Sequence, residues 1–439
     1  HDKLEFDVVL TAYDFTFDEK FDQRYADVLT REEFLQYKGA LKELTSNVLE
    51  NSENSSLNLA LAKIDFLEKK QKKDNLTPAN DPFSLSDNIN TLLAECIEYG
   101  TIPFSIIARH GFIAETLMRS IVSKGIISNE RISAFKKSVK TIASDISKDF
   151  EKVCSNKISV DVFNELYGHL RPSSYDIVSP NYMNRKDLFS GITQKQSKTG
   201  RFVLNNKERQ NINIMLLEHG FDSTSADDIF IYAKKSIIGR EYAKFIFTKH
   251  LSNIIEFIAD WGKSINLNRA DVSMLMLSDI NRVLLSPLTD ETKEYYRNKI
   301  KTSKLDFELA SSFKLSYLIR SVKDIYIAPI QRSVANYVGN KRIEKSIVIL
   351  NPYKSDEPVL EDKIVCIEGA DPGYDWIFTR NIAGLVTKYG GANSHMAIRC
   401  AEYGIPAAIG CGEQPFDKIT KSKKIILDCK AEKIEYIEY

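Results

Sequence analysis

A glycine pair followed closely by a histidine is the feature that most constrains how this chain can fold. The run Thr387-Lys-Tyr-Gly-Gly-Ala-Asn-Ser-His395 follows an apolar stretch at 383–387 and precedes an apolar, periodic stretch that ends at Gly404. This order predicts a strand, a tight glycine loop and a short helix. Asn393 or Ser394 can cap that helix, which places the histidine in its first turn.

The predicted loop contains the groups that a phosphate-binding site needs. Glycines let backbone N–H groups approach a ligand closely, and the start of a helix favours negative charge. An imidazole with an ordinary pKa of about 6.5 is largely neutral, and so nucleophilic, near pH 7. We predict that His395 is the catalytic residue of a phosphohistidine intermediate, cradled by Thr387, Gly390, Gly391, Asn393 and Ser394. A histidine that only caps a helix would need neither the glycine pair nor the hydroxyl groups.

The composition indicates a globular protein of more than one domain. The chain has 439 residues, 43% of them hydrophobic and 27% charged, and its 60 basic and 60 acidic side chains cancel. No polyanion-binding surface, membrane span or signal peptide is indicated, so we expect a cytoplasmic protein without nucleic-acid or membrane partners. The six cysteines are scattered and no metal-ligand spacing is present, so no metal site is predicted.

The pattern along the chain changes near residue 330. An opening strand is expected at 4–11, followed by amphipathic helices at 57–69, 106–122, 129–154, 227–261 and 307–327. Short β-rich runs follow at 346–350, 364–368, 383–387, 407–409, 424–427 and 434–437, with helices expected at 375–381 and 394–403. We therefore predict a multidomain fold of α plus α/β type, with a mostly helical domain at 1–330 and a compact β/α domain at 331–439.

The segment from Asp371 to Gly412 resembles the swivelling phosphohistidine domain of the PEP-utilising enzymes, such as phosphoenolpyruvate synthase, pyruvate phosphate dikinase and rifampicin phosphotransferase. The residues that match the motif are Trp376, Thr387, Gly390, Gly391, Ser394, His395, Ala397, Ile398, Gly404, Ile405 and Pro406. The resemblance implies that His395 accepts a phosphoryl or pyrophosphoryl group and that the domain moves between two sites. Hinges are expected at 329–333 and 340–345.

The same resemblance implies a donor and an acceptor elsewhere. In this family an ATP-grasp domain binds ATP and Mg²⁺, and residues 1–330 contain no nucleotide-binding motif. We therefore expect a fragment whose ATP-grasp domain precedes it, with no cofactor bound in this chain itself. A family order of ATP-grasp, acceptor and histidine domains implies that the acceptor binds in the helical domain.

Three segments resemble the L-glutamine kinases of bacterial capsular phosphoramidate biosynthesis: His1-Asp-Lys-Leu-Glu-Phe-Asp-Val-Val-Leu10, Gly168-His-Leu-Arg-Pro-Ser-Ser-Tyr-Asp176 and Gly369-Ala-Asp-Pro-Gly-Tyr-Asp-Trp-Ile-Phe378. This resemblance implies transfer of phosphate to the side-chain amide nitrogen of L-glutamine, with AMP and phosphate as the other products. A phosphotransferase that acts on a hydroxyl group, as in rifampicin inactivation, is the alternative within the same chemistry. A non-catalytic phosphohistidine carrier is the alternative of another class.

An amino-acid acceptor needs a cation for its carboxylate and an anion for its ammonium group. The candidates that we predict are Arg171, His169, Tyr175, Asp176, Arg109, His110 and Arg240. Each also has a structural explanation. Arg171 can pair with Asp176 in a loop, a Glu115–Arg119 pair at helical spacing can explain the charges beside Arg109, and Arg240 with Glu241 and Lys244 can form a solvated helix face.

Overall fold

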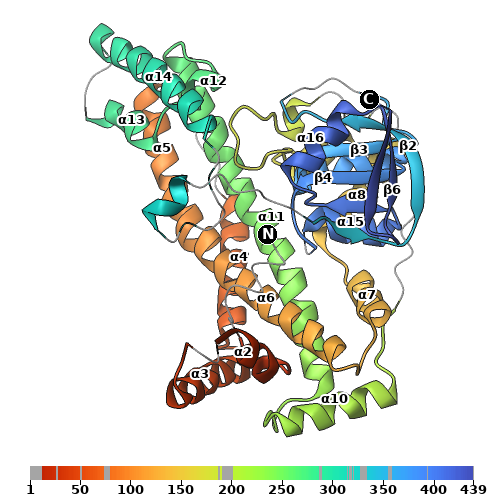
Figure 1. Ribbon diagram of the computed structural model, residues 1–439. Helices are drawn as coiled ribbons and strands as arrows, with labels where there is room; N and C mark the ends of the chain where they lie inside the picture. The colour runs from red at the N-terminus through yellow and green to blue at the C-terminus, as the bar shows by residue number, and fades with distance from the viewer. Residues whose placement is uncertain are drawn as a thin grey trace.

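The computed structural model of the chain describes residues 12–25, 28–49, 52–73, 80–185, 188–189, 201–285, 289–313, 315, 319, 321–326, 334–353, 358–392 and 394–438. An elongated helical region lies beside a compact α/β domain (Figure 1). This agrees with the predicted combination of a helical region and an α/β unit. The strand expected at 4–11 lies outside the described residues.

The helical region is built around one long central helix, α11 (Ala226–Ser264). Capping explains where α11 begins, because the Ser225 side chain accepts from the Asp228 N–H and Asp228 returns the bond. Ile64, Ile107 and Phe247 are fully buried at its contacts with two neighbouring helices. The surrounding elements are α2 (Phe17–Tyr25), α3 (Arg31–Leu49), α4 (Ser56–Lys73), α5 (Pro82–Glu95), the π-helix η1 (Cys96–Thr101), α6 (Ile102–Ser123), α7 (Asn129–Ser138), α10 (Asn206–Glu218), α12 (Arg269–Val272), α13 (Leu277–Ile280), the 3₁₀ helix η3 (Asn281–Leu284) and α14 (Asp290–Ser311).

Two of the expected helices differ from the structure. The helix expected at 129–154 is divided into α7 and α8 (Ile142–Cys154), because Val139 adopts an extended conformation between them. The helix expected at 307–327 does not continue as predicted, since α14 ends at Ser311 and, among the described residues after it, only Val322–Tyr326 are helical, as the 3₁₀ turn η4. The periodicity at 307–327 consists of exposed apolar side chains such as Phe307 and Leu309, which nothing among the described residues covers.

The α/β domain contains one seven-stranded mixed sheet in the order β1-β5-β4-β3-β2-β6-β7. Strands β5, β4, β3 and β2 are parallel, and the other three pair antiparallel at the two ends. Six of the strands fall on the runs expected from the sequence, whereas β1 was not expected. The strands are β1 (Asn336–Val338), β2 (Arg342–Ile349), β3 (Ile364–Gly369), β4 (Gly384–Tyr389), β5 (Ala407–Ile409), β6 (Lys424–Asp428) and β7 (Lys433–Glu438).

Helices cover both faces of this sheet. One face packs against the helix α16 (Glu413–Lys421) through Phe416 and Ile419. The other packs against α15 (His395–Tyr403) and the 3₁₀ helix η5 (Pro372–Arg380), which was expected as an ordinary helix.

Elements that precede residue 330 also contribute to the apolar core between the sheet and α15 with η5. Helices α8 and α9 (Val160–Tyr167) contribute Phe150 and Phe163 to it, and α8 lies against the sheet in Figure 1. Residues 142–185, with the short 3₁₀ turn η2 (Tyr182–Asn184) among them, therefore connect the helical region to the α/β domain, and we call them the connecting segment.

One continuous helical stretch, Pro82–Ser123, is long and apolar enough to cross a membrane by length and composition. It consists of α5, η1 and α6, and it packs against α4 and α11. A core helix of a folded domain passes the same test, so this stretch is weak evidence for a span.

Candidate functional site

His395 begins α15, directly after the loop that follows β4. The Ser394 hydroxyl accepts a hydrogen bond from the Ala397 N–H at 3.3 Å and caps the helix, while the Ser394 N–H donates to the Gly391 carbonyl at 3.0 Å. Gly404 ends the helix with φ +63°. The predicted strand, loop and helix are thus present, and Asn393 lies outside the described residues.

The loop sits where the carboxyl ends of parallel strands meet, an edge at which α/β proteins commonly bind ligands. The Thr387 hydroxyl accepts from the Gly410 N–H at 2.8 Å, which links the loops after β4 and β5. Gly390 has φ +134°, and an added Cβ would lie 2.6 Å from that of Ala370. Glycine is therefore required at this position. Thr387 is fully buried, so its hydroxyl holds the loop in shape.

Two carboxylates hold the His395 ring from opposite sides. Its Nε2 atom lies 2.8 Å from Oδ1 of Asp375, which belongs to η5 of the same domain. Its Nδ1 atom lies 3.2 Å from Oε2 of Glu241, on α11 of the helical region. His395 is only 9% exposed. The candidate nucleophile is therefore located at the contact between the two parts of the molecule.

Asp375 is itself fixed by a buried arginine. Arg399, one turn after His395, places its Nε atom 3.2 Å from the same Oδ1 atom of Asp375. The guanidinium also bonds Glu402 at 2.5 Å and Tyr403 at 2.9 Å, and it contacts Ser147 of α8. Arg399 is 1% exposed. Because a buried ion pair needs such additional hydrogen bonds to be maintained, the cluster sets the orientation of Asp375.

The electrostatics of this arrangement favour a protonated histidine. Burial alone lowers the pKa of His395, but the charges and hydrogen bonds of Asp375 and Glu241 outweigh it and raise the pKa to about 9. Burial likewise opposes the ionised forms of the two carboxyl groups, yet His395 keeps the pKa of both below their ordinary values. In this position the ring is an imidazolium between two carboxylates, which is not a nucleophile.

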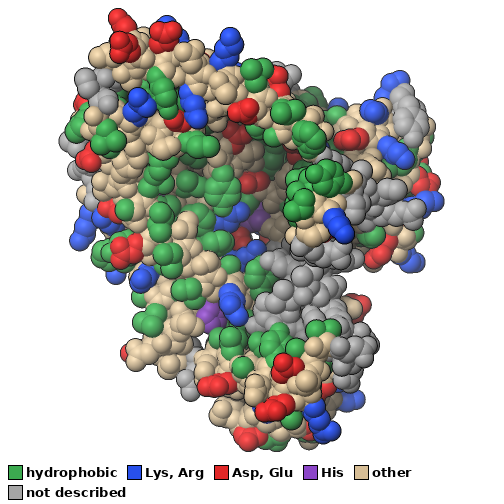
Figure 2. Space-filling view, turned by 60° about the vertical axis from the view of Figure 1, so that its left-hand side comes forward, with side chains coloured by type: hydrophobic (Ala, Val, Ile, Leu, Met, Phe, Trp, Pro, Cys, Tyr) green, Lys and Arg blue, Asp and Glu red, His purple; other side chains and the backbone are tan. Residues whose placement is uncertain are grey.

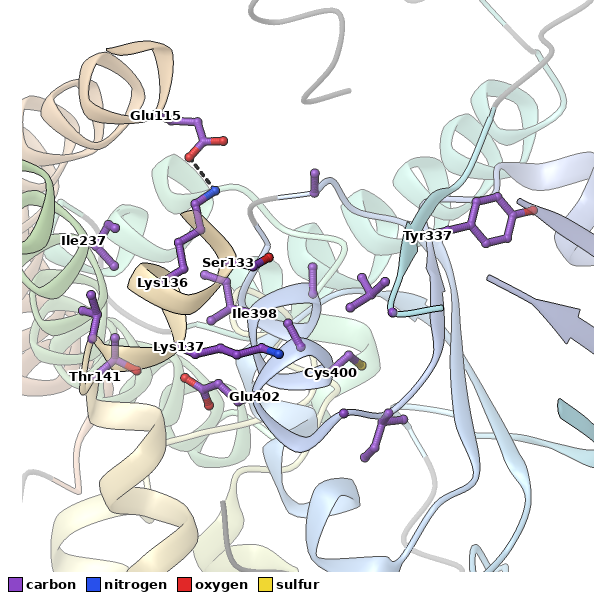
Figure 3. Close-up of a pocket in the computed structure, with 18 of the residues that line it drawn as sticks. Glu115, Ser133, Lys136, Lys137, Thr141, Ile237, Tyr337, Ile398, Cys400 and Glu402 are labelled. Atoms are coloured by element: carbon purple, nitrogen blue, oxygen red, sulfur yellow. Dashed lines mark ion pairs between the residues drawn. The ribbon is translucent and has the colours of Figure 1, made fainter. Parts of the chain in front are cut away.

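A cavity of about 440 Å³ opens beside the Glu241 carboxylate, between α6, α7 and α11 on one side and α15 with the β1–β2 turn on the other. We call it the interdomain cavity; its lining includes Phe112, Lys137, Arg240, Lys341 and Ile398. Figure 3 shows Lys137 extending from the end of α7 towards α15, where Ile398, Cys400 and Glu402 lie. The space-filling view shows charged side chains and a histidine gathered in the hollow between the two parts (Figure 2).

The structure separates the seven predicted acceptor residues instead of bringing them together. Arg240 lines the interdomain cavity. Tyr175 and Asp176 line a second cavity of about 680 Å³, beside Asp371 and Tyr374. Arg109 and His110 line a third cavity of about 430 Å³ between α3, α4 and α6. His110 bonds Ser56 and Tyr232 there, both at 2.9 Å. Of these residues, only Arg240 lies beside the Glu241 carboxylate.

Arg171 and His169 are buried in the connecting segment. Arg171 pairs with Glu256 of α11 at 2.9 Å, so the structural pairing expected with the Asp176 carboxylate is replaced by a contact to the Asp176 carbonyl at 3.4 Å. His169 packs edge-on against Phe245, and no side chain or backbone group among the described residues hydrogen-bonds its ring nitrogens. Burial lowers the pKa of His169 to about 3, so its ring is neutral. These two side chains are inside the fold and do not line the interdomain cavity.

The connecting segment instead holds the α/β domain in place. The backbone at Gly373 lies so close to the Arg171 carbonyl that an added Cβ would be 1.8 Å from its oxygen. The Tyr182 hydroxyl donates to the Gly373 carbonyl at 2.8 Å, and the Ser174 hydroxyl donates to Asp371 at 3.1 Å. The 168–176 and 369–378 segments, which were singled out separately in the sequence, therefore pack against each other.

Sequence reasoning missed the two carboxylates. Asp375 was included in a matched segment but given no role, and Glu241 was assigned to a solvated helix face. That assignment is wrong for Glu241, whose side chain is 12% exposed and contacts His395. Ile238 and Phe245, three residues before and four residues after Glu241, lie on the same face of α11 and pack against the core, which is a signal for burial. The expected Glu115–Arg119 pair is present at 2.9 Å.

One segment of the α/β domain is similar to known proteins. Residues 359–432 match the family model described as PEP-utilising enzyme, mobile domain. The phosphoenolpyruvate synthase of Aquifex aeolicus (strain VF5) is 30% identical over 100 residues, which are 23% of this chain and 11% of that protein. The chain thus spans only a small part of the length of this curated relative. The segment that carries His395 is related to the PEP-utilising enzyme mobile domain.

Proposed function

We propose that the protein is a phosphotransferase in which His395 carries a phosphoryl group to a small acceptor bound in the interdomain cavity. The observation that supports this most directly is the position of Glu241. Its carboxylate contacts His395 on one side and lines the cavity on the other. A histidine at the start of a helix, next to a glycine loop, is suited to carry a phosphate, and the related mobile domain supports the same chemistry.

In the transfer step a nucleophile of the acceptor attacks phosphorus and the bond between phosphorus and the ring nitrogen breaks. The acceptor loses a proton, which Glu241 accepts and passes to the ring nitrogen that has lost its phosphoryl group. Asp375 meanwhile stabilises positive charge on the ring, which makes the imidazole a better leaving group. The step ends in an imidazolium between two carboxylates, the arrangement that the structure contains.

Accepting the phosphoryl group requires a different position of the domain. A protonated ring with a pKa of about 9 is a poor nucleophile, and contact with Glu241 contributes to that value. Moving away from α11 removes the Glu241 contribution. In our proposal ATP and Mg²⁺ are bound by an ATP-grasp domain outside this chain, and the acceptor is the side-chain amide nitrogen of L-glutamine, giving AMP and phosphate over the cycle.

The test uses a donor that does not depend on the ATP-binding domain. The chain is treated with potassium phosphoramidate, and mass spectrometry locates the added phosphoryl group. We expect acid-labile modification at His395, lost in His395→Asn and kept in the control His219→Asn. The modified chain is then mixed with L-glutamine or with hydroxyl compounds and followed by phosphorus NMR. An acid-stable product would show a hydroxyl acceptor, and a stable phosphohistidine that no acceptor discharges would favour a carrier.

A further inference from the structure

The three carboxylates of the interdomain cavity all have cationic partners. Glu115 pairs with Lys136 at 2.7 Å and with Arg119 at 2.9 Å. Glu402 pairs with Arg399 at 2.5 Å, and Glu241 contacts His395. The negative charges of the cavity are therefore compensated within the protein.

Three cations of the same cavity form no such ion pair among the described residues. Lys137, Arg240 and Lys341 form no ion pair with a carboxylate among the described residues, although all three line the cavity. The Arg240 guanidinium lies 5.5 Å from the centre of the Phe112 ring. The Lys341 ammonium donates to the Gly404 carbonyl at 2.8 Å, and its other two hydrogens have no partner in the part of the chain that the structure describes. The cavity therefore has an excess of positive charge.

The three cations come from both parts of the molecule. Lys137 belongs to the last turn of α7 and Arg240 to α11, whereas Lys341 lies in the turn between β1 and β2 of the α/β domain. A ligand that bonds Lys137 and Lys341 together touches the helical region and the α/β domain at once. A volume of about 440 Å³ suits a small molecule of amino-acid size.

We infer that the acceptor carries a carboxylate, which Lys137 and Lys341 bind across the interdomain cavity. This inference rests on the proposed transfer from His395, because it identifies the chemical class of the acceptor at that same site. The carboxylate is bound at the electropositive side, and the reacting group is directed to Glu241. Since both lysines are in reach only when the domain is docked, carboxylate binding and docking favour each other.

Isothermal titration calorimetry of the unphosphorylated chain tests the binding. The probes are L-glutamine, the dicarboxylate glutarate, and L-glutaminamide, in which an amide replaces the α-carboxylate. We expect L-glutamine to bind about tenfold or more tightly than L-glutaminamide, as a charged hydrogen bond is worth about 1.5–3 kcal/mol. Lys137→Met and Lys341→Met should each weaken L-glutamine about tenfold. Lys140→Met, an exposed neighbour outside the cavity lining, should leave the affinity unchanged.

A second readout is the shape of the chain in solution. L-Glutamine should make the small-angle scattering profile more compact, and this change should disappear in either lysine variant. The inference is overturned if L-glutamine and glutarate bind no more tightly than L-glutaminamide, or if both lysine variants bind as the wild type does. Failure of the proposed transfer looks different, because the carboxylates would still bind while phosphorylated His395 stayed undischarged.

Discussion

The two carboxylates beside His395 belong to regions that hold it in different ways. Asp375 is part of the α/β domain, its side chain is fully buried, and Arg399 fixes it from the same domain. Glu241 belongs to the helical region, lines a cavity, and reaches His395 from the opposite side. Asp375 therefore accompanies the histidine wherever the domain moves, whereas Glu241 acts only when the domain is docked. One region carries the reactive group and the other supplies the place where it reacts.

Asp375→Asn should have the largest effect, because it removes the permanent partner. The change breaks the buried ion pairs of Asp375 with His395 and Arg399 and leaves Arg399 only its pair with Glu402, and breaking a buried pair costs about 3–5 kcal/mol. The pKa of His395 should fall as well, since Asp375 is the main cause of its elevation. Chemical denaturation measures the first effect and NMR titration of the ring protons the second. Asp417→Asn, an exposed change in the same domain, should alter neither. If Asp375→Asn changes neither the stability of the chain nor the pKa of His395, Asp375 is not the permanent partner of His395.

The same ion pairs predict how stability depends on pH. The pKa of His395 is about 9 in the folded chain, against about 6.5 in an unfolded one. A raised pKa stabilises the fold fully below pH 6.5, and this contribution is lost as the pH rises through 9. The denaturation midpoint should therefore fall between pH 6.5 and pH 9. Asp375→Asn should flatten this slope, and an equally steep slope in the variant would contradict the assignment.

Glu241→Gln should affect transfer and leave phosphorylation of His395 intact. Losing a proton acceptor typically slows a reaction by about 10²-fold or more. The rate is measured by discharging the phosphorylated chain with the acceptor. The pKa of His395 should fall less than in Asp375→Asn. Asp260→Asn, an exposed change on the same helix, is the matched control. Equal discharge rates in Glu241→Gln and the control would exclude Glu241 from the reaction.

Gly373→Ala should separate the two regions without disturbing the sheet. An added Cβ would lie 1.8 Å from the Arg171 carbonyl oxygen, and relieving such overpacking costs about 1–3 kcal/mol. Small-angle scattering should show a more extended chain, and the helical content should be retained. Gly369→Ala is the control, because an added Cβ there meets no atom within 4 Å. A compact Gly373→Ala variant would show that this contact does not hold the domain.

Ser174→Ala should have the smallest effect. It removes the hydroxyl bonds to the Asp371 carboxylate, but the backbone N–H groups of Ser174 and Gly373 still bond that carboxylate, so we expect a loss of only about 1 kcal/mol. The fraction of extended chain should increase slightly in the same scattering experiment. Ser173→Ala, which removes a neighbouring hydroxyl for which the structure gives no hydrogen bond, should match the wild type. If Ser173→Ala has the larger effect, the Asp371 contact is not what docks this segment.

The part of the site inside the α/β domain could be predicted from sequence because it is local. His395, Gly390 and Ser394 fall within six residues, and strand, loop and helix follow from residue types and spacing. Asp375 is 20 residues away, and its contact with His395 depends on how η5 folds back across the sheet. Nothing in the spacing of the two residues encodes that path.

The part of the site in the helical region could not be predicted for a related reason. Periodicity shows which face of α11 is apolar, but it does not show what covers Glu241 at its edge. The pairing of Glu241 with His395 joins residues 154 positions apart. Arg171 and the polar residues around it were predicted to bind the acceptor because they are close in sequence. In the structure Arg171 instead pairs with Glu256 inside the fold.

The close approach of Gly373 to the Arg171 backbone also limits how such proteins can be recombined. The segments at 168–176 and 369–378 pack with no room for a methyl group between them, so the shape of each is complementary to the other. A chimera that takes residues 334–438 from one protein and its helical partner from another would need both segments from the same parent. Exchanging the α/β domain alone would bring together a 168–176 segment and a 369–378 segment whose surfaces are not complementary.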